Sequence, residues 1–133
     1  MEPKELELWI FDRLLSKNLI LDKLKNVFKN SEVKLSPHEI TYPSGSRIKF
    51  LVHSYDTNHR IRGINPDEIS LFCIDDTLPD ALEEYSYKHK KYVKTELYYE
   101  LLNRLISRKG SLYKQNVETF AENGHIKELL YRG

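Results

Sequence analysis

The stretch Ile69-Ser70-Leu71-Phe72-Cys73-Ile74-Asp75-Asp76 decides the fold class of this 133-residue chain. It is an almost unbroken apolar run that ends on two adjacent carboxylates. Such a run is typical of a strand buried on both faces of a parallel sheet. The carboxylates would then lie at the carboxyl edge of the sheet, where α/β folds bind their ligands. Cys73 falls within the strand and is expected to be a buried core thiol.

The two acids have two interpretations. In nucleotide-hydrolysing folds the first acid after such a strand holds Mg²⁺ and the second polarises water. On that interpretation Asp75 is the metal ligand and Asp76 the catalytic residue. On the other interpretation both acids only open the next segment, with Asp76-Thr77-Leu78-Pro79 as a turn or helix start. Because apolar strands that end in Asp are common, the octet alone does not separate the two.

The composition indicates one soluble globular domain over residues 1–133. Lys and Arg number 21 against 20 Asp and Glu, so the net charge of +1 predicts no strong general attraction to nucleic acid. The single cysteine suits a reducing compartment. The sequence has neither an apolar run of about 18 residues nor a signal peptide, so no membrane association is expected.

Helical periodicity dominates the first thirty residues. Residues 5–17 are predicted to form a helix, with Pro3 placed to start it. A second helix is predicted over about 19–29, with Ile20, Leu24, Val27 and Phe28 on one side. These helices would form an N-terminal part over residues 1–30, and residues 31–133 would form the core.

The core begins where the apolar period changes from 3.6 to 2. Ile40 and Tyr42 mirror Ile48, Phe50 and Val52, which predicts a hairpin over 39–52 with its turn at Ser44-Gly45. The other expected elements are a loop over 53–67, a short helix over about 79–86, a tyrosine- and lysine-rich connection, an amphipathic helix over about 94–108 that stops at Gly110, a strand over 112–117 and a terminal helix over about 124–131.

Four motifs follow one another in a recognisable order over about residues 30–133. They are the hairpin with its Ser44-Gly45 turn, Arg62-Gly63, the strand ending in Asp75-Asp76, and the segment Gly110 to Thr119 after a helix. This order resembles part of the ATPase domain of viral large terminases, the motors that pump DNA into capsids. The match runs from the hairpin through the Walker B strand to the coupling motif.

The resemblance implies a three-layer, P-loop-ATPase-like sheet fragment with a β-hairpin and flanking helices. It implies ATP and Mg²⁺ as cofactors, DNA and other motor or capsid-portal subunits as partners, and the cytoplasm of a virus-infected cell as location. The functional positions that it implies are Asp75 for the metal, Asp76 for catalysis, and Arg62, Gly63, Asn116 and Thr119 for the phosphates or for coupling.

The chain departs from the terminase pattern at three places. The second acid is Asp76 where the family usually has Glu, and Asn116-Val117-Glu118-Thr119 lacks the usual Thr-Pro ending. No Gly-x-x-x-x-Gly-Lys-Ser/Thr loop precedes the hairpin, so no backbone cradle or lysine is predicted for the phosphates. On the motor hypothesis, another chain or segment supplies that loop, and the isolated chain is expected to be inactive.

The alternative hypothesis is a stand-alone viral or mobile-element protein. It would use a degenerate terminase-like scaffold to bind a host protein or a nucleic acid without catalysis. A basic segment with interleaved tyrosines suits nucleic acid, and its lysines are Lys88, Lys90, Lys91 and Lys94. The same segment is also typical of a solvated connection between helices, and the sequence favours that simpler interpretation.

Overall fold

The computed structural model describes residues 4–54, 57–74, 83–94, 96–108, 110–122 and 124–132. The acids Asp75 and Asp76 lie outside the described residues, as does the rest of the segment up to residue 82. The elements in chain order are β1 (Leu6–Phe11), α1 (Leu14–Val27), β2 (Lys34–Leu35), β3 (Glu39–Thr41), β4 (Arg47–Val52), α2 (Thr57–Ile61), β5 (Glu68–Cys73), β6 (Glu83–Ser86), β7 (Lys91–Lys94), α3 (Glu96–Arg108), β8 (Ser111–Asn116), α4 (Val117–Glu122), α5 (His125–Glu128) and the 3-10 turn η1 (Leu129–Tyr131).

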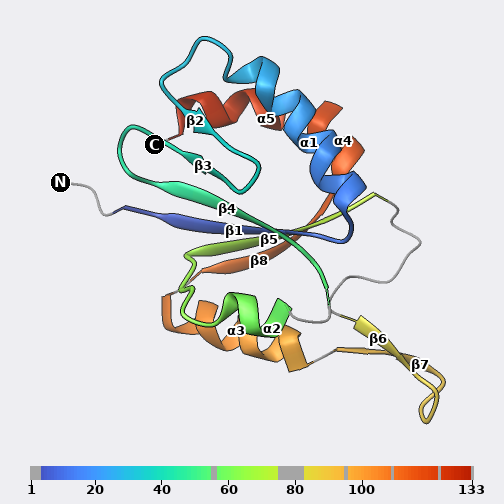
Figure 1. Cartoon of the computed structure of the whole chain (residues 1–133). Helices are drawn as coiled ribbons and strands as arrows, with labels where there is room; N and C mark the ends of the chain where they lie inside the picture. The colour runs from blue at the N-terminus through green and yellow to red at the C-terminus, as the bar shows by residue number, and fades with distance from the viewer. Residues whose placement is uncertain are drawn as a thin grey trace.

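The main sheet is mixed and has six strands in the order β2-β3-β4-β1-β5-β8. The strands β4, β1, β5 and β8 are parallel, whereas β2 and β3 extend the sheet in antiparallel fashion beyond β4. Helices α1, α4 and α5 cover one face and α2 and α3 the other, which gives three α/β/α layers (Figure 1). If the four parallel strands are numbered 1 to 4 as they occur in the chain, they lie across the sheet in the order 2-1-3-4, which is common in doubly wound sheets. The strand order reverses between β1 and β5.

Strand β5 confirms the prediction made from the apolar octet. It pairs in parallel with β1 on one side and β8 on the other, so both of its faces are covered. Ile69, Leu71 and Phe72 are almost completely buried, and Cys73 is only 1% exposed. The unbroken apolar run therefore reflects a strand with no solvent-facing side.

The helix predicted over residues 5–17 is wrong at residues 6–11 and correct only from Leu14 onward. Residues 6–11 form β1, the central strand between β4 and β5, and α1 begins at Leu14. Leu8 and Ile10 face one layer of helices while Trp9 and Phe11 face the other, so every position from Leu8 to Phe11 is buried. A run that is apolar on both faces has no period that separates helix from strand, and pairing with two neighbours decides for the strand.

The other predictions are confirmed in large part. The second predicted helix exists as α1 but begins at Leu14, and the hairpin of β3 and β4, the strand β8 and the helix α3 are where the sequence predicted them. The terminal helix is α5, continued by η1. The predicted loop contains α2, and α4 was not predicted. The helix predicted over about 79–86 is wrong at residues 83–86, which form β6, and its first part lies outside the described residues.

Two cores of different character fill the space between the layers. Under α1, α4 and α5 the core is aromatic, and the rings of Trp9 and Phe72 lie 4.7 Å apart. Under α2 and α3 the core is aliphatic, built on Leu8, Ile10 and Leu101. None of the helices within the described ranges has the length and apolar character needed to cross a membrane.

Candidate functional site

The carboxyl edge of the parallel strands is the first candidate site, because doubly wound sheets bind ligands at the carboxyl ends of the strands where the strand order reverses. Here β1 ends beside β5, and Asp12 follows β1 directly. The backbone N–H of Asp12 donates to the carbonyl of Phe72 at 2.9 Å, and that of His53 donates to Phe11 at 2.8 Å. These bonds continue the pairing past the strand ends and bring Asp12 and His53 to the same edge.

The Asp12 carboxylate is occupied by its own turn. It accepts a hydrogen bond from the Ser16 hydroxyl and forms an ion pair with Arg13 at 3.2 Å, while its side chain is only 11% exposed. Among the described residues, no three His, Cys, Asp or Glu side chains come together to hold a metal ion. The contacts of Asp12 therefore stabilise the turn from β1 into α1. This turn consists of Asp12 and Arg13 and contains no glycine.

The residues that the terminase resemblance assigned to phosphates or coupling are spread over the fold. Arg62 and Gly63 lie in the crossover from β4 to β5, where Arg104 of α3 donates to the carbonyl of Ile64 at 2.9 Å. Asn116 ends β8 at the carboxyl edge, and its amide donates to the carbonyl of Ile74 at 3.2 Å. Its side-chain oxygen accepts the N–H of Thr119 at 3.0 Å, so Asn116 caps α4.

The second place is the hairpin of β6 and β7, which extends away from the three layers (Figure 1). Among the described elements, β6 and β7 have substantial contacts only with each other. The register of the hairpin pairs Glu83 with Lys94 and Tyr85 with Tyr92, and both pairs therefore lie on one face of the two-stranded ribbon. The ion pair between Lys94 and Glu83 closes the base at 2.7 Å.

Three exposed tyrosines form a cluster on that face. The ring of Tyr85 contacts those of Tyr87 and Tyr92 edge-on, with centroids 5.0 and 5.2 Å away. Tyr87 is 86% exposed and Tyr92 52%. Large aromatic rings that are left in water on a two-stranded ribbon are unusual, because such a ribbon has no core of its own to bury them.

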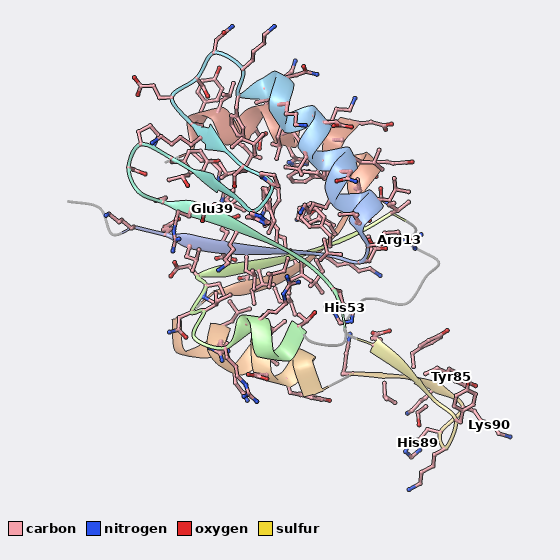
Figure 2. All side chains as sticks on the ribbon, viewed as in Figure 1. Arg13, Glu39, His53, Tyr85, His89 and Lys90 are labelled. Carbon is pink, nitrogen blue, oxygen red and sulfur yellow. The ribbon has the colours of Figure 1, made fainter. Side chains whose placement is uncertain are left out.

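The tip and outer edge of the ribbon are basic. Residues 85–94 contain four lysines and one histidine but no carboxylate. Lys88, Lys90 and Lys91 are exposed and form no ion pair with the side chains that the structure describes. His89 and Lys90 lie at the turn, with Tyr85 just behind them (Figure 2). The predicted nucleic-acid lysines are thus brought together on a projecting element rather than in a connection between helices.

Two parts of these sites were missed from the sequence although a signal was present. Leu8 to Phe11 followed by Asp12 is a second, shorter apolar run that ends on an acid, and the helix prediction hid it. Glu83, Tyr85 and Tyr87 alternate with other residues, as do Tyr92 and Lys94 after the turn. That period of 2 around a polar tetrad is typical of a hairpin.

Comparison with known proteins identifies no relative. No protein-family model, no curated protein and no solved structure matches the chain.

Proposed function

We propose that this protein binds single-stranded nucleic acid through the β6–β7 hairpin, with the α/β layers as a non-catalytic scaffold. The observation that carries the proposal is the exposed cluster of Tyr85, Tyr87 and Tyr92 beside three lysines that have no described carboxylate partner.

The chemistry of the ribbon suits a single strand better than a duplex. Unpaired bases stack on aromatic side chains with about 1–3 kcal/mol per base, and the faces of paired bases are not available for this. Tyr87 presents nearly all of its ring to solvent. The lysines at the tip supply the charge that neutralises backbone phosphates. Bases on the tyrosines and phosphates on the lysines would therefore be held by one short element.

A contribution of this chain to a DNA-packaging ATPase is the second proposal, and it has less support. It rests on Asp75 and Asp76, which lie outside the described residues. The turn from β1 into α1, where a doubly wound sheet would cradle phosphates, is Asp12-Arg13. A carboxylate without a glycine-rich backbone is a poor partner for phosphate, so we place binding ahead of catalysis.

The test is fluorescence anisotropy with a labelled oligo(dT) of about 16 nucleotides and a duplex of equal length. We expect the single strand to bind more tightly than the duplex. Replacing Lys88, Lys90 and Lys91 by Gln should flatten the plot of log K against log salt by about 2, since each phosphate contact contributes about 0.7. Tyr87→Ala should weaken binding about tenfold.

The matched control is a triple variant that removes the same charge elsewhere. Lys23, Lys29 and Lys34 are exposed residues on or after α1, and replacing them by Gln should leave affinity and salt slope unchanged. Equal losses in both triple variants would show a general charge effect and overturn the assignment to the hairpin. Absence of wild-type binding at about 50 mM salt would overturn the proposal itself.

A further inference from the structure

A cavity of about 470 Å³ lies on the aromatic face of the sheet, and the described residues that line it come from β1, β5, β8 and the C-terminal segment. Its volume falls in the range of small-molecule sites, about 300–1,000 Å³. Its lining runs from Glu5, Glu7 and Glu68 at the amino ends of β1 and β5 to Phe72 and Gln115 near the carboxyl ends of β5 and β8. The hairpin of β6 and β7 contributes no residue to this lining among the described residues.

Two polar side chains point into this cavity with unused hydrogen-bonding capacity. Ser70 is only 8% exposed, lines the cavity, and its hydroxyl has no partner among the described residues. Gln115, two positions further along the neighbouring strand from the residue that pairs with Ser70, also lines it and also has no described partner. A ligand in the cavity would find in each of these side chains both a donor and an acceptor that no described residue uses.

The charge around the cavity is predominantly negative. Four carboxylates line it, those of Glu5, Glu7, Glu68 and Glu128, against one guanidinium, that of Arg132, and the imidazole of His125. The Arg132 charge is already matched, since Arg132 forms an ion pair with Glu7. Glu128 lies 3.7 Å from the His125 imidazole, and Glu68 accepts the N–H of Ser111 at 3.1 Å. With His125 neutral, three negative charges remain in excess, and they favour a ligand that is a cation.

The walls of the cavity are aromatic. Trp9 and Phe120 meet edge to face at 5.6 Å, Phe72 lies against both, and the ring of Phe120 is stacked on His125 at 5.6 Å. Trp9 and Phe72 are only 2% and 1% exposed, so their rings lie beneath the surface of the cavity. The partly buried ring of Phe120 is the aromatic surface that a ligand would contact. Trp9 Nε1 donates to Glu7 at 3.2 Å, which fixes the orientation of the indole.

We propose that this cavity binds a small organic cation, an amidinium or ammonium group carried on an apolar body. The body packs against Phe120, beside the buried ring of Trp9, the cationic group donates to the carboxylates, and Ser70 and Gln115 complete its hydrogen bonds. The proposal is independent of nucleic-acid binding by the hairpin.

The natural probe is Trp9, because it is the only tryptophan of the chain. Benzamidine should change the intrinsic fluorescence along a saturable curve and raise the melting temperature. Benzamide has the same shape without the charge, and benzoate has the opposite charge, so neither should bind. Equal responses to benzamidine and benzamide, or no response of fluorescence and melting temperature to benzamidine, would overturn the proposal.

Charge-removing variants locate the site. The double variant Glu68→Gln with Glu128→Gln should raise the dissociation constant of benzamidine about tenfold, the effect expected for losing a charge-assisted hydrogen bond. The control is Glu118→Gln with Glu122→Gln, two exposed acids of α4 that do not line the cavity, and it should bind as the wild type does. Because the wild-type titrations need no variant, a cavity variant that fails to fold leaves the proposal testable. Unchanged affinity in a folded cavity variant would refute it.

Discussion

The sharpest test of this fold is Gly110→Ala, at the turn from α3 into β8. A Cβ atom at residue 110 would lie 1.8 Å from the carbonyl oxygen of Asp67, whereas real Cβ contacts below 3.0 Å are essentially not seen. Backbone must therefore move, and Asp67 is not free to do so. Its N–H donates to Leu6 at 2.7 Å and its carboxylate accepts the N–H of Leu6 at 2.8 Å, which anchors the start of β5 to the start of β1.

The expected cost follows from those contacts. Opening the distance from 1.8 Å to at least 3.0 Å is an overpacking strain of about 1–3 kcal/mol. Weakening the two hydrogen bonds of Asp67 adds about 1 kcal/mol each. Gly110→Ala should thus lower the free energy of unfolding by about 3–5 kcal/mol, a large part of the roughly 5–15 kcal/mol of a typical domain.

Urea unfolding followed by Trp9 fluorescence measures this, since Trp9 lies in the core and is only 2% exposed. Gly63→Ala is the control. Gly63 has a φ of +82° but open space around it, so only the left-handed backbone is penalised, by about 1–2 kcal/mol. The reasoning about close approach is refuted if Gly110→Ala is no more destabilising than Gly63→Ala.

Three further predictions concern the Tyr42 hydroxyl, the acid pair Asp75 and Asp76, and ATP hydrolysis. Burial raises the pKa of Tyr42 from 10.0 to about 12, so its contribution to stability is complete below pH 10 and is lost as the pH rises to 12. Because the buried hydroxyl has no described partner, Tyr42→Phe should be no less stable at pH 8 and should lose less stability between pH 10 and 12 in urea unfolding. If Asp75 and Asp76 repel each other in a Walker B-like site, Asp76→Asn should raise the free energy of unfolding by about 0.5–1 kcal/mol. If Asp76 caps a helix instead, the Asn variant should be neutral and the Ala variant should lose about 1 kcal/mol. Thermal melts of both variants separate the two cases. The isolated chain should not turn over ATP, since carboxylates without a phosphate cradle do not position the nucleotide. Turnover of about 1 s⁻¹ that Asp75→Ala abolishes would contradict this.

Local pattern carried much of the fold. The alternation from Ile40 to Val52 around Ser44-Gly45 specifies a hairpin whatever packs against it. The apolar run from Ile69 to Cys73 specifies a strand with two covered faces, because no position in it except Ser70 suits water. The 3.6 period of α3 and the glycine beyond it specify a helix and its end: the N–H of Gly110 closes on the carbonyl of Leu105 at 3.1 Å.

Only the tertiary structure decided what Leu6 to Phe11 would become. The later residues of this segment are apolar on both faces, so no period separates helix from strand. The choice depends on hydrogen bonds to β4 and β5, which lie about 40 and 60 residues further along the sequence. The hairpin of β6 and β7 depends on pairing rather than on burial, and its period of 2 lies in exposed tyrosines and charged residues rather than in a buried apolar face.

The candidate sites divide along the same line. Composition alone identified the lysines and tyrosines of residues 85–94, but the contact between Tyr85 and Tyr92 and their exposure come from the register of two strands. The cavity was not predictable at all, because Glu7, Ser70 and Arg132 stand far apart in the sequence. Their meeting requires three parallel strands in register and a chain end folded back over them. Sequence specifies which short segments form elements, while the chemistry that the elements share is set by long-range pairing.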